Sequence, residues 1–140
     1  MTLEYDPWNV QLVMSFIENM DPWGFEHLCA QCLNRNGYSL AQVTPGSNDY
    51  GVDIIAVRGE EKWAFQCKRW KSNRYVDMSA VHQVYKGCHI YGCTHAAVIT
   101  TTLFTDLTRV QAQQLGVHLW DRYQLYYLVH AALKEYGIGC

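Results

Sequence analysis

The chain has 140 residues and a mass of 16.2 kDa, and 49% of its residues are hydrophobic and 14% aromatic. This length predicts a single domain over residues 1–140, because it supplies one compact core and is too short for two domains. Only 17% of the residues are charged and the formal net charge is −2, which excludes a disordered acidic chain and a uniformly basic nucleic-acid-binding protein.

The charges are unevenly distributed along the chain. Residues 1–61 carry nine acids and two bases, whereas residues 62–140 carry nine bases and four acids. Five of the 11 bases lie between Lys62 and Arg74, with no acid among them. An acidic protein can therefore carry a local anion-binding surface in this segment.

The chain contains no apolar run of the roughly 18–20 residues that cross a bilayer, and its first residues are acidic. We therefore expect a soluble cytoplasmic protein that does not interact with membranes. The six cysteines are expected to be reduced thiols at core positions rather than a disulfide framework or a zinc site.

The first third of the chain predicts two helices. Apolar residues at helical spacing indicate a helix over residues 8–20. Asp21 followed by Pro22 is typical of an N-cap and first helical position, so a second helix begins there and ends near Gly37. This helix places Glu26 in its first turn, from where its carboxylate would point toward the edge of the sheet.

Three strands are predicted next, over residues 38–44, 52–57 and 62–68. Residues 59–61 form a tight turn, so the second and third of these strands pair as an antiparallel hairpin. In the third strand, Trp63, Phe65 and Cys67 occupy one face, and Gln66 and Lys68 the other.

Helices and strands alternate in the remainder of the chain. Helices are predicted over residues 77–91, 105–115 and 122–136, and strands over residues 96–101 and 117–120. The element order predicts an α/β fold in which helices flank both faces of a mixed β-sheet.

The predicted hairpin brings together three polar side chains. Asp53 lies within the strand over 52–57, and Gln66 and Lys68 end the next strand on a common face. Carboxylate and amide oxygens suit Mg²⁺ or Mn²⁺, so Asp53 and Gln66 are candidate metal ligands. Lys68 beside that ion could stabilise a phosphoryl transition state or orient a water molecule.

Structural roles remain open for each of these residues. Asp53 could form a buried ion pair with Lys68 or an arginine. Gln66 and Lys68 could be solvent-facing residues of an edge strand. Glu26 could interact only with the dipole of its own helix.

At these positions the chain resembles the Mrr-like restriction endonucleases, a branch of the PD-(D/E)xK nuclease superfamily. The resemblance covers residues from about 25 to 128 and consists of five ordered segments. These are Phe25-Glu26 with Gly37-Tyr38, Asp49 to Ile54, Gln66-Cys67-Lys68-Arg69, Val98-Ile99-Thr100-Thr101 with Phe104-Thr105, and Gly116-Val117-His118-Leu119.

The resemblance implies a restriction-endonuclease-like core and an Mg²⁺- or Mn²⁺-dependent DNA endonuclease. It implies that Asp53 is a metal ligand, that Gln66 replaces the more usual acid, that Lys68 is the catalytic lysine and that Glu26 is a helix carboxylate of the site. Gln83 lies where such nucleases often carry a polar site residue, and Asp49 is a candidate supporting residue in the turn before Asp53.

The basic segment supplies candidate DNA contacts. Basic and aromatic residues alternate there, a composition typical of surfaces that follow a phosphate backbone. The candidate contacts are Arg69, Trp70, Lys71 and Arg74, and the run from Thr100 to Thr102 could add phosphate contacts.

Cleavage of both strands of a duplex needs two active sites, so a homodimer is expected, with the helical extension over residues 1–20 as part of its interface. Two other functions remain open. The chain could be a catalytically inactive DNA-binding or protein-interaction module of the same fold. It could also be a structure-specific, junction-resolving nuclease.

Overall fold

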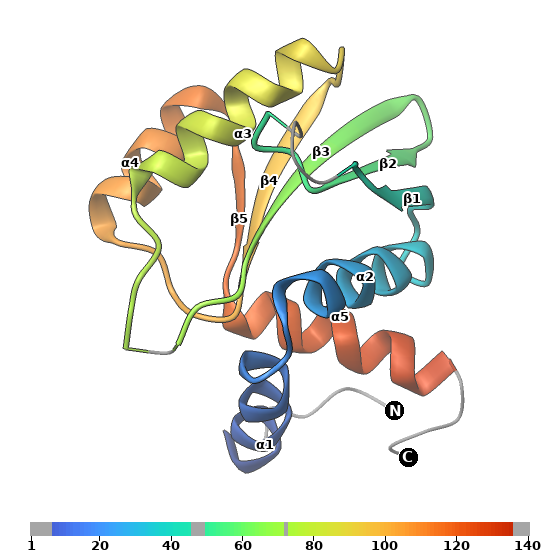
Figure 1. Ribbon diagram of the computed structural model, residues 1–140, viewed down its shortest axis with the longest axis vertical. Helices are drawn as coiled ribbons and strands as arrows, with labels where there is room; N and C mark the ends of the chain where they lie inside the picture. The colour runs from blue at the N-terminus through green and yellow to red at the C-terminus, as the bar shows by residue number, and fades with distance from the viewer. Residues whose placement is uncertain (1–6, 46–49, 72, 136–140) are drawn as a thin grey trace.

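The computed structural model describes residues 7–45, 50–71 and 73–135, and the side chains from residue 10 to residue 132 within those ranges. Figure 1 shows a twisted sheet with helices on both sides. In chain order the elements are α1 (Pro7–Glu18), α2 (Pro22–Asn34), β1 (Ser39–Val43), β2 (Ile54–Arg58), β3 (Glu61–Lys68), α3 (Met78–Ile90), β4 (His95–Thr100), α4 (Asp106–Leu115), β5 (His118–Trp120) and α5 (Arg122–Glu135).

The sheet has five strands in the order β1-β2-β3-β4-β5. β1, β2 and β3 pair antiparallel, whereas β3, β4 and β5 pair parallel. Ile54 of β2 lies opposite Phe65 of β3, and Cys67 lies opposite Ile99 of β4. The predicted α/β fold with a mixed sheet is confirmed, and β3 is the strand at which the pairing changes direction.

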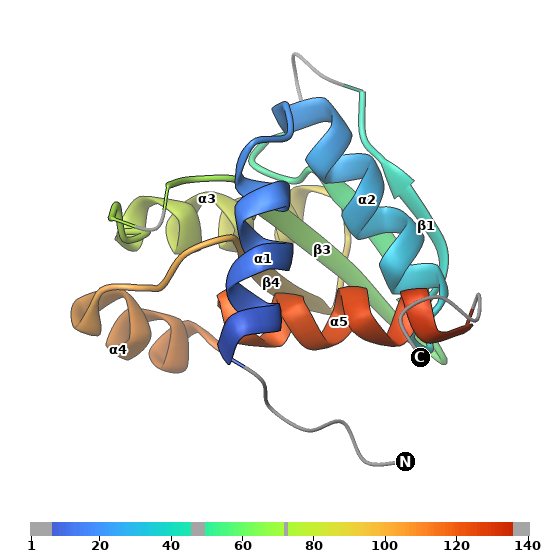
Figure 2. The same cartoon turned by 90° about the horizontal axis from the view of Figure 1, so that it is seen from below.

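Helices cover both faces of this sheet (Figure 2), and a hydrophobic core lies on each face. The first core, between the sheet and α1, α2 and α5, contains the largest buried aromatic side chains, including Phe25, Trp63 and Phe65. The second core, between the sheet and α3 and α4, contains mainly valine and alanine, together with Phe104. Because successive residues of β3 alternate between faces, Phe65 enters the first core and Gln66 faces α3.

Local sequence signals account for the element boundaries. The Asp21 carboxylate accepts a hydrogen bond from the Gly24 amide at 2.6 Å, with Pro22 in the first turn, as predicted for the start of α2. The turn between β2 and β3 contains Gly59 at a φ of 60°, a conformation that glycine adopts without strain.

α1 packs against the body of the chain. Val10, Met14 and Ile17 are buried in the first core, so most of the apolar face of the helix is already covered within the chain. Leu12 and Phe16 remain 55% and 74% exposed on its outer side. Within the described ranges, no helix is long and apolar enough to span a membrane.

The described cysteines are free thiols, and Cys29, Cys32 and Cys88 are buried, as predicted. Burial is the largest cause that raises the pKa of Cys32, to about 12. These cysteines therefore behave as small core residues.

Candidate active site

Asp53 lies immediately before β2 rather than within the strand, which corrects the predicted boundary of residues 52–57. Its backbone still pairs on both sides, because its N–H donates to the Phe65 carbonyl at 2.7 Å and its own carbonyl accepts from the Thr44 N–H at 2.9 Å. The Asp53 carboxylate accepts a hydrogen bond from the backbone N–H of Cys67 at 2.7 Å. The acid is thus joined to the residue between Gln66 and Lys68.

Gln66 is only 4% exposed and reaches across to α3. Its Nε2 donates to the Gln83 Oε1 at 2.9 Å and to the Gly51 carbonyl at 3.2 Å. Its Oε1 is buried and has no hydrogen-bond partner among the residues that the structure describes. A buried carbonyl oxygen without a partner is unfavourable by about 1–3 kcal/mol, so this atom is a ready ligand for a cation or a water molecule.

The segment before β2 is held tightly against α3. A Cβ at Gly51 would lie 2.9 Å from the Gln83 Cβ and carbonyl oxygen, and a Cβ at Gly87 would clash with the Tyr50 carbonyl oxygen. Only glycine permits both approaches. These contacts could not be predicted from the sequence, because glycine spacing alone does not show which segments meet.

Lys68 shares a face of β3 with Gln66, and its Nζ lies 5.8 Å from the centre of the Trp70 ring. Buried threonines hold the backbone around it. Thr100 Oγ1 donates to the Lys68 carbonyl at 2.7 Å, and Thr101 Oγ1 donates to the Trp70 carbonyl at 2.6 Å. Thr100, Thr101 and Thr102 are fully buried, so the prediction that they contact phosphates is wrong: they support the strand end from inside.

Glu26 lies in the second turn of α2, not in the first turn as predicted, because the helix begins at Pro22. The charge of its carboxylate nevertheless affects the pKa of Cys67, as the charge of Asp53 does. A hydrogen bond with the Cys29 thiol and burial raise the pKa of Cys67 well above its usual value, and the charges of Cys29, Asp53 and Glu26 raise it further. Of the two predicted carboxylates, Asp53 is therefore hydrogen-bonded to the Gln66-Cys67-Lys68 segment, and Glu26 acts on Cys67 through its charge.

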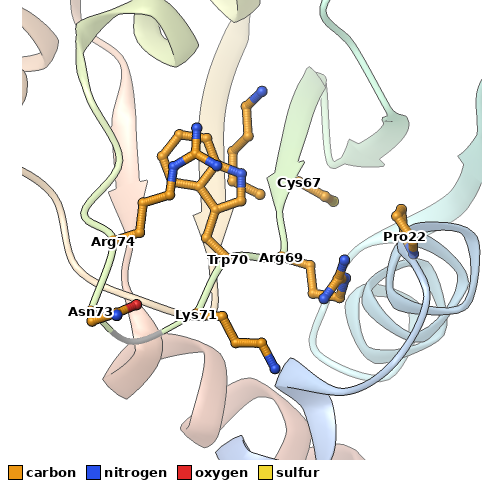
Figure 3. Close-up of a pocket in the computed structure, with 8 residues that line it drawn as sticks. Pro22, Cys67, Arg69, Trp70, Lys71, Asn73 and Arg74 are labelled. Carbon is orange, nitrogen blue, oxygen red and sulfur yellow. The ribbon is translucent and has the colours of Figure 1, made fainter.

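An open groove of about 530 Å³ begins at this strand end and continues along the following loop (Figure 3). Among the residues that the structure describes, four cationic side chains line it and none of the lining residues is acidic; the residues are Pro22, Cys67, Lys68, Arg69, Trp70, Lys71, Asn73 and Arg74. The groove therefore suits an anionic ligand.

The predicted DNA contacts occupy different positions in this groove. The Arg69 Nη1 donates to the Glu18 carbonyl at the end of α1, at 2.8 Å, and Lys71 Nζ lies 3.4 Å from the Asn19 Oδ1. The Arg74 guanidinium stacks on the Trp70 ring, 3.9 Å from its centre, as Figure 3 shows. Arg69 thus connects α1 to the groove, whereas the Arg74 guanidinium lies over the Trp70 ring.

The residues present fit a hard divalent cation. No three His, Cys, Asp or Glu side chains among the described residues form a ready metal-binding cluster. Mg²⁺, however, is often held by only one or two protein oxygens together with water molecules. The Asp53 carboxylate and the unpartnered Gln66 Oε1 are oxygens of this kind. Asp49, the other acid proposed near the site, lies outside the described residues.

Solved structures share this fold. The DNA modification-dependent restriction endonuclease AspBHI superposes with a TM-score of 0.70 at 20% sequence identity, covering 97% of this chain and 37% of AspBHI. MspJI restriction endonuclease, solved in complex with a 27-mer oligonucleotide, superposes with a TM-score of 0.63 at 17% identity, covering 91% of this chain and 30% of MspJI.

A third structure, the protein of unknown function AF1548, superposes with a TM-score of 0.63 at 18% identity, covering 80% of this chain and 65% of AF1548. This chain spans only about a third of the length of the two restriction enzymes. No curated protein matches its sequence.

A family model described as restriction endonuclease, that of the Mrr catalytic domain, matches residues 17–129. The match contains β2, β3 and α3, and so includes Asp53, Gln66, Lys68 and Gln83. The predicted resemblance is confirmed over most of the chain, and the chain belongs to the restriction endonuclease family.

Proposed function

We propose that this chain is a metal-dependent endonuclease that hydrolyses phosphodiester bonds in DNA. The observation that carries the proposal is the hydrogen bond between the Asp53 carboxylate and the Cys67 amide, which joins the acid to the Gln66-x-Lys68 segment. Membership in the restriction endonuclease family supports the nuclease class. The oligonucleotide bound to the related MspJI supports DNA as the partner.

In this proposal Asp53 and Gln66 hold Mg²⁺ or Mn²⁺, and Glu26 contributes a further carboxylate to the site. The bound ion would supply Lewis-acid stabilisation of the phosphate and a more acidic water molecule. Asp53 is oriented by the Cys67 amide, and the neutral Gln66 supplies an oxygen without an added negative charge. Lys68 donates hydrogen bonds to a phosphate oxygen, where negative charge increases during attack.

DNA binding is proposed for the groove. Lys71 and Arg74 would contact phosphates, and the Trp70 ring with the stacked Arg74 would contact a sugar or base. Arg69 is already hydrogen-bonded to Glu18, so it would contribute mainly its charge. Cleavage of both strands is proposed to require a homodimer, in which the exposed Leu12 and Phe16 of α1 provide apolar contacts.

The test is cleavage of supercoiled plasmid DNA by the purified chain, with and without Mg²⁺ or Mn²⁺, beside Asp53→Asn. We expect nicking or linear product only with metal, and a loss of about 100-fold or more in Asp53→Asn, because the substitution removes the carboxylate charge. Branched and modified DNA are tested in parallel. Binding to DNA without cleavage of any of these substrates would contradict the proposal and favour the inactive binding module.

A further inference from the structure

A glutamine at a metal-binding position has a problem of orientation that a carboxylate does not have. The two oxygens of a glutamate are equivalent, but a glutamine presents oxygen on one side and an NH₂ group on the other. Only the oxygen binds a cation, so a rotated amide would point two N–H donors at the ion. The surroundings of Gln66 must therefore select one of two orientations.

The Nε2 group of Gln66 donates hydrogen bonds to two acceptors. One is the Gly51 carbonyl, 3.2 Å from Nε2, which can only accept a hydrogen bond. The other is Gln83 Oε1, 2.9 Å from Nε2. Both amide hydrogens are thereby engaged, and Oε1 is left buried, with no partner among the described residues.

The position of Gln83 is itself fixed by backbone packing. The close approach of Gly51 to the Cβ and carbonyl oxygen of Gln83 holds α3 against the segment that leads into Asp53. Gln83 is exposed on α3 and contacts Gln66 from the side opposite the free oxygen. It would therefore act through Gln66 and not as a metal ligand.

We infer that Gln83 is a positioning residue whose side-chain oxygen holds the Gln66 amide with Oε1 presented to the divalent cation. The inference rests on the proposed function, because it assigns Gln66 to the metal site. Partners that orient metal ligands typically contribute 10–100-fold to metal affinity. Since the Gly51 carbonyl retains one of the two hydrogen bonds, we expect an effect near the lower limit.

The experiment measures Mn²⁺ affinity of the full chain by electron paramagnetic resonance, without DNA, so that the readout does not depend on turnover. Gln83→Met removes the acceptor at similar side-chain volume and is expected to weaken Mn²⁺ binding about tenfold. Gln83→Glu keeps an acceptor at this position and is expected to bind Mn²⁺ at least as tightly as the parent chain. Gln113→Met, at an exposed glutamine of α4, is the matched control and is expected to change nothing.

The same substitutions are then repeated in a Gln66→Glu background. A glutamate at position 66 has two equivalent oxygens and no orientation to select, so Gln83→Met should change Mn²⁺ affinity there by less than about twofold. Thermal unfolding of each variant checks that the fold is retained.

The outcomes separate this inference from the proposed function. If the parent chain binds Mn²⁺ and cleaves DNA but Gln83→Met binds Mn²⁺ equally well, the inference is wrong and the nuclease proposal stands. An equal loss in the parent and the Gln66→Glu backgrounds also overturns the inference, because the effect would then not depend on amide orientation. If the parent chain neither binds Mn²⁺ nor cleaves DNA, the proposed function itself fails.

Discussion

The two ends of β3 both carry polar and aromatic residues around an open cavity, but they differ in how fully the polar groups are partnered. At the turn end, a cavity of about 570 Å³ is lined by Tyr38, Arg58, Gly59, Glu61, Trp63, His95, His118 and Trp120. Glu61 accepts from Trp63 Nε1 at 3.0 Å and lies 3.3 Å from His95 Nε2, and Lys62 Nζ donates to the Tyr91 carbonyl at 2.9 Å.

At the opposite end, the groove has a similar volume of about 530 Å³ but a different character. Among the described residues, cationic side chains line it without an acid, and the buried Gln66 Oε1 has no partner. Cavity size therefore does not distinguish the two ends. Unbalanced charge and an unsatisfied buried oxygen distinguish them, because such features are unfavourable unless a ligand compensates for them.

The largest expected effect is on DNA cleavage, and it is tested by substituting each of two lysines on the same face of β3. Lys68→Met is expected to reduce DNA cleavage by about 100-fold or more, because it removes a donor placed beside the site. Lys62→Met, at the turn end, is expected to cleave DNA at the parental rate and to lose about 1 kcal/mol of stability with its hydrogen bond to Tyr91. Single-turnover cleavage and urea unfolding measure the two effects; equal cleavage by both variants would contradict the assignment of the active end.

The second expected effect is on the free energy of unfolding, and it is tested by substituting two glycines with positive φ, one on either side of β2. Gly51→Ala is expected to reduce the free energy of unfolding by about 2 kcal/mol or more, because its Cβ would meet Gln83 at 2.9 Å. Gly59→Ala, in the turn, meets no described residue within 4 Å and is expected to lose only about 1 kcal/mol through its φ of 60°. Urea unfolding of both variants measures the difference; a larger loss at Gly59 would contradict the packing of Gly51 on α3.

A smaller effect concerns Asp77, which caps α3 at the groove end. Hydrogen bonds from the Ser79 hydroxyl and amide lower the pKa of this carboxyl. The ionised Asp77 carboxylate therefore stabilises the folded chain above the ordinary aspartate pKa of about 3.9, and this stabilisation is lost as the pH falls through the lower pKa of the folded state. Asp77→Ala is expected to lose about 0.5–1 kcal/mol at pH 7, since the side chain is exposed.

Urea unfolding of Asp77→Ala and the parent chain between pH 7 and pH 3 measures this effect, and the two stabilities should converge at low pH. Asp106→Ala, an exposed acid of α4 that is not the N-cap, is the control. If the free energy of unfolding of Asp77→Ala differs from that of the parent chain by the same amount at every pH, the charge of the capping carboxylate is not the cause of the lost stability.

The smallest expected effect is at the turn end. Glu61→Gln keeps an acceptor for Trp63 and weakens only the half-exposed contact with His95. We expect a stability change below about 1 kcal/mol and parental cleavage, because such pairs are screened by solvent. Thermal unfolding and plasmid cleavage measure both; a marked loss of cleavage would indicate that the two ends are coupled.

Much of the candidate site was predictable from β3 and its neighbours. Alternation along the strand correctly separates Phe65, which enters the first core, from Gln66, which faces α3. The hairpin then brings Asp53 next to the Gln66-Cys67-Lys68 segment. Where the prediction was wrong, as for the buried threonines at the end of β4, the sequence contained polar residues whose partners lie about thirty positions away.

The sequence by itself determined the elements, their order and which residues share a face, because these depend on local periodicity, caps and turns. Tertiary structure alone decided which hydrogen bonds form between distant segments. It joined Asp53 to the Cys67 amide, turned the Gln66 amide toward Gly51 and Gln83, and attached Arg69 to the end of α1. The physical reason is that each bond needs two groups within about 3 Å in a suitable direction, and only the packing of helices on the sheet sets those positions.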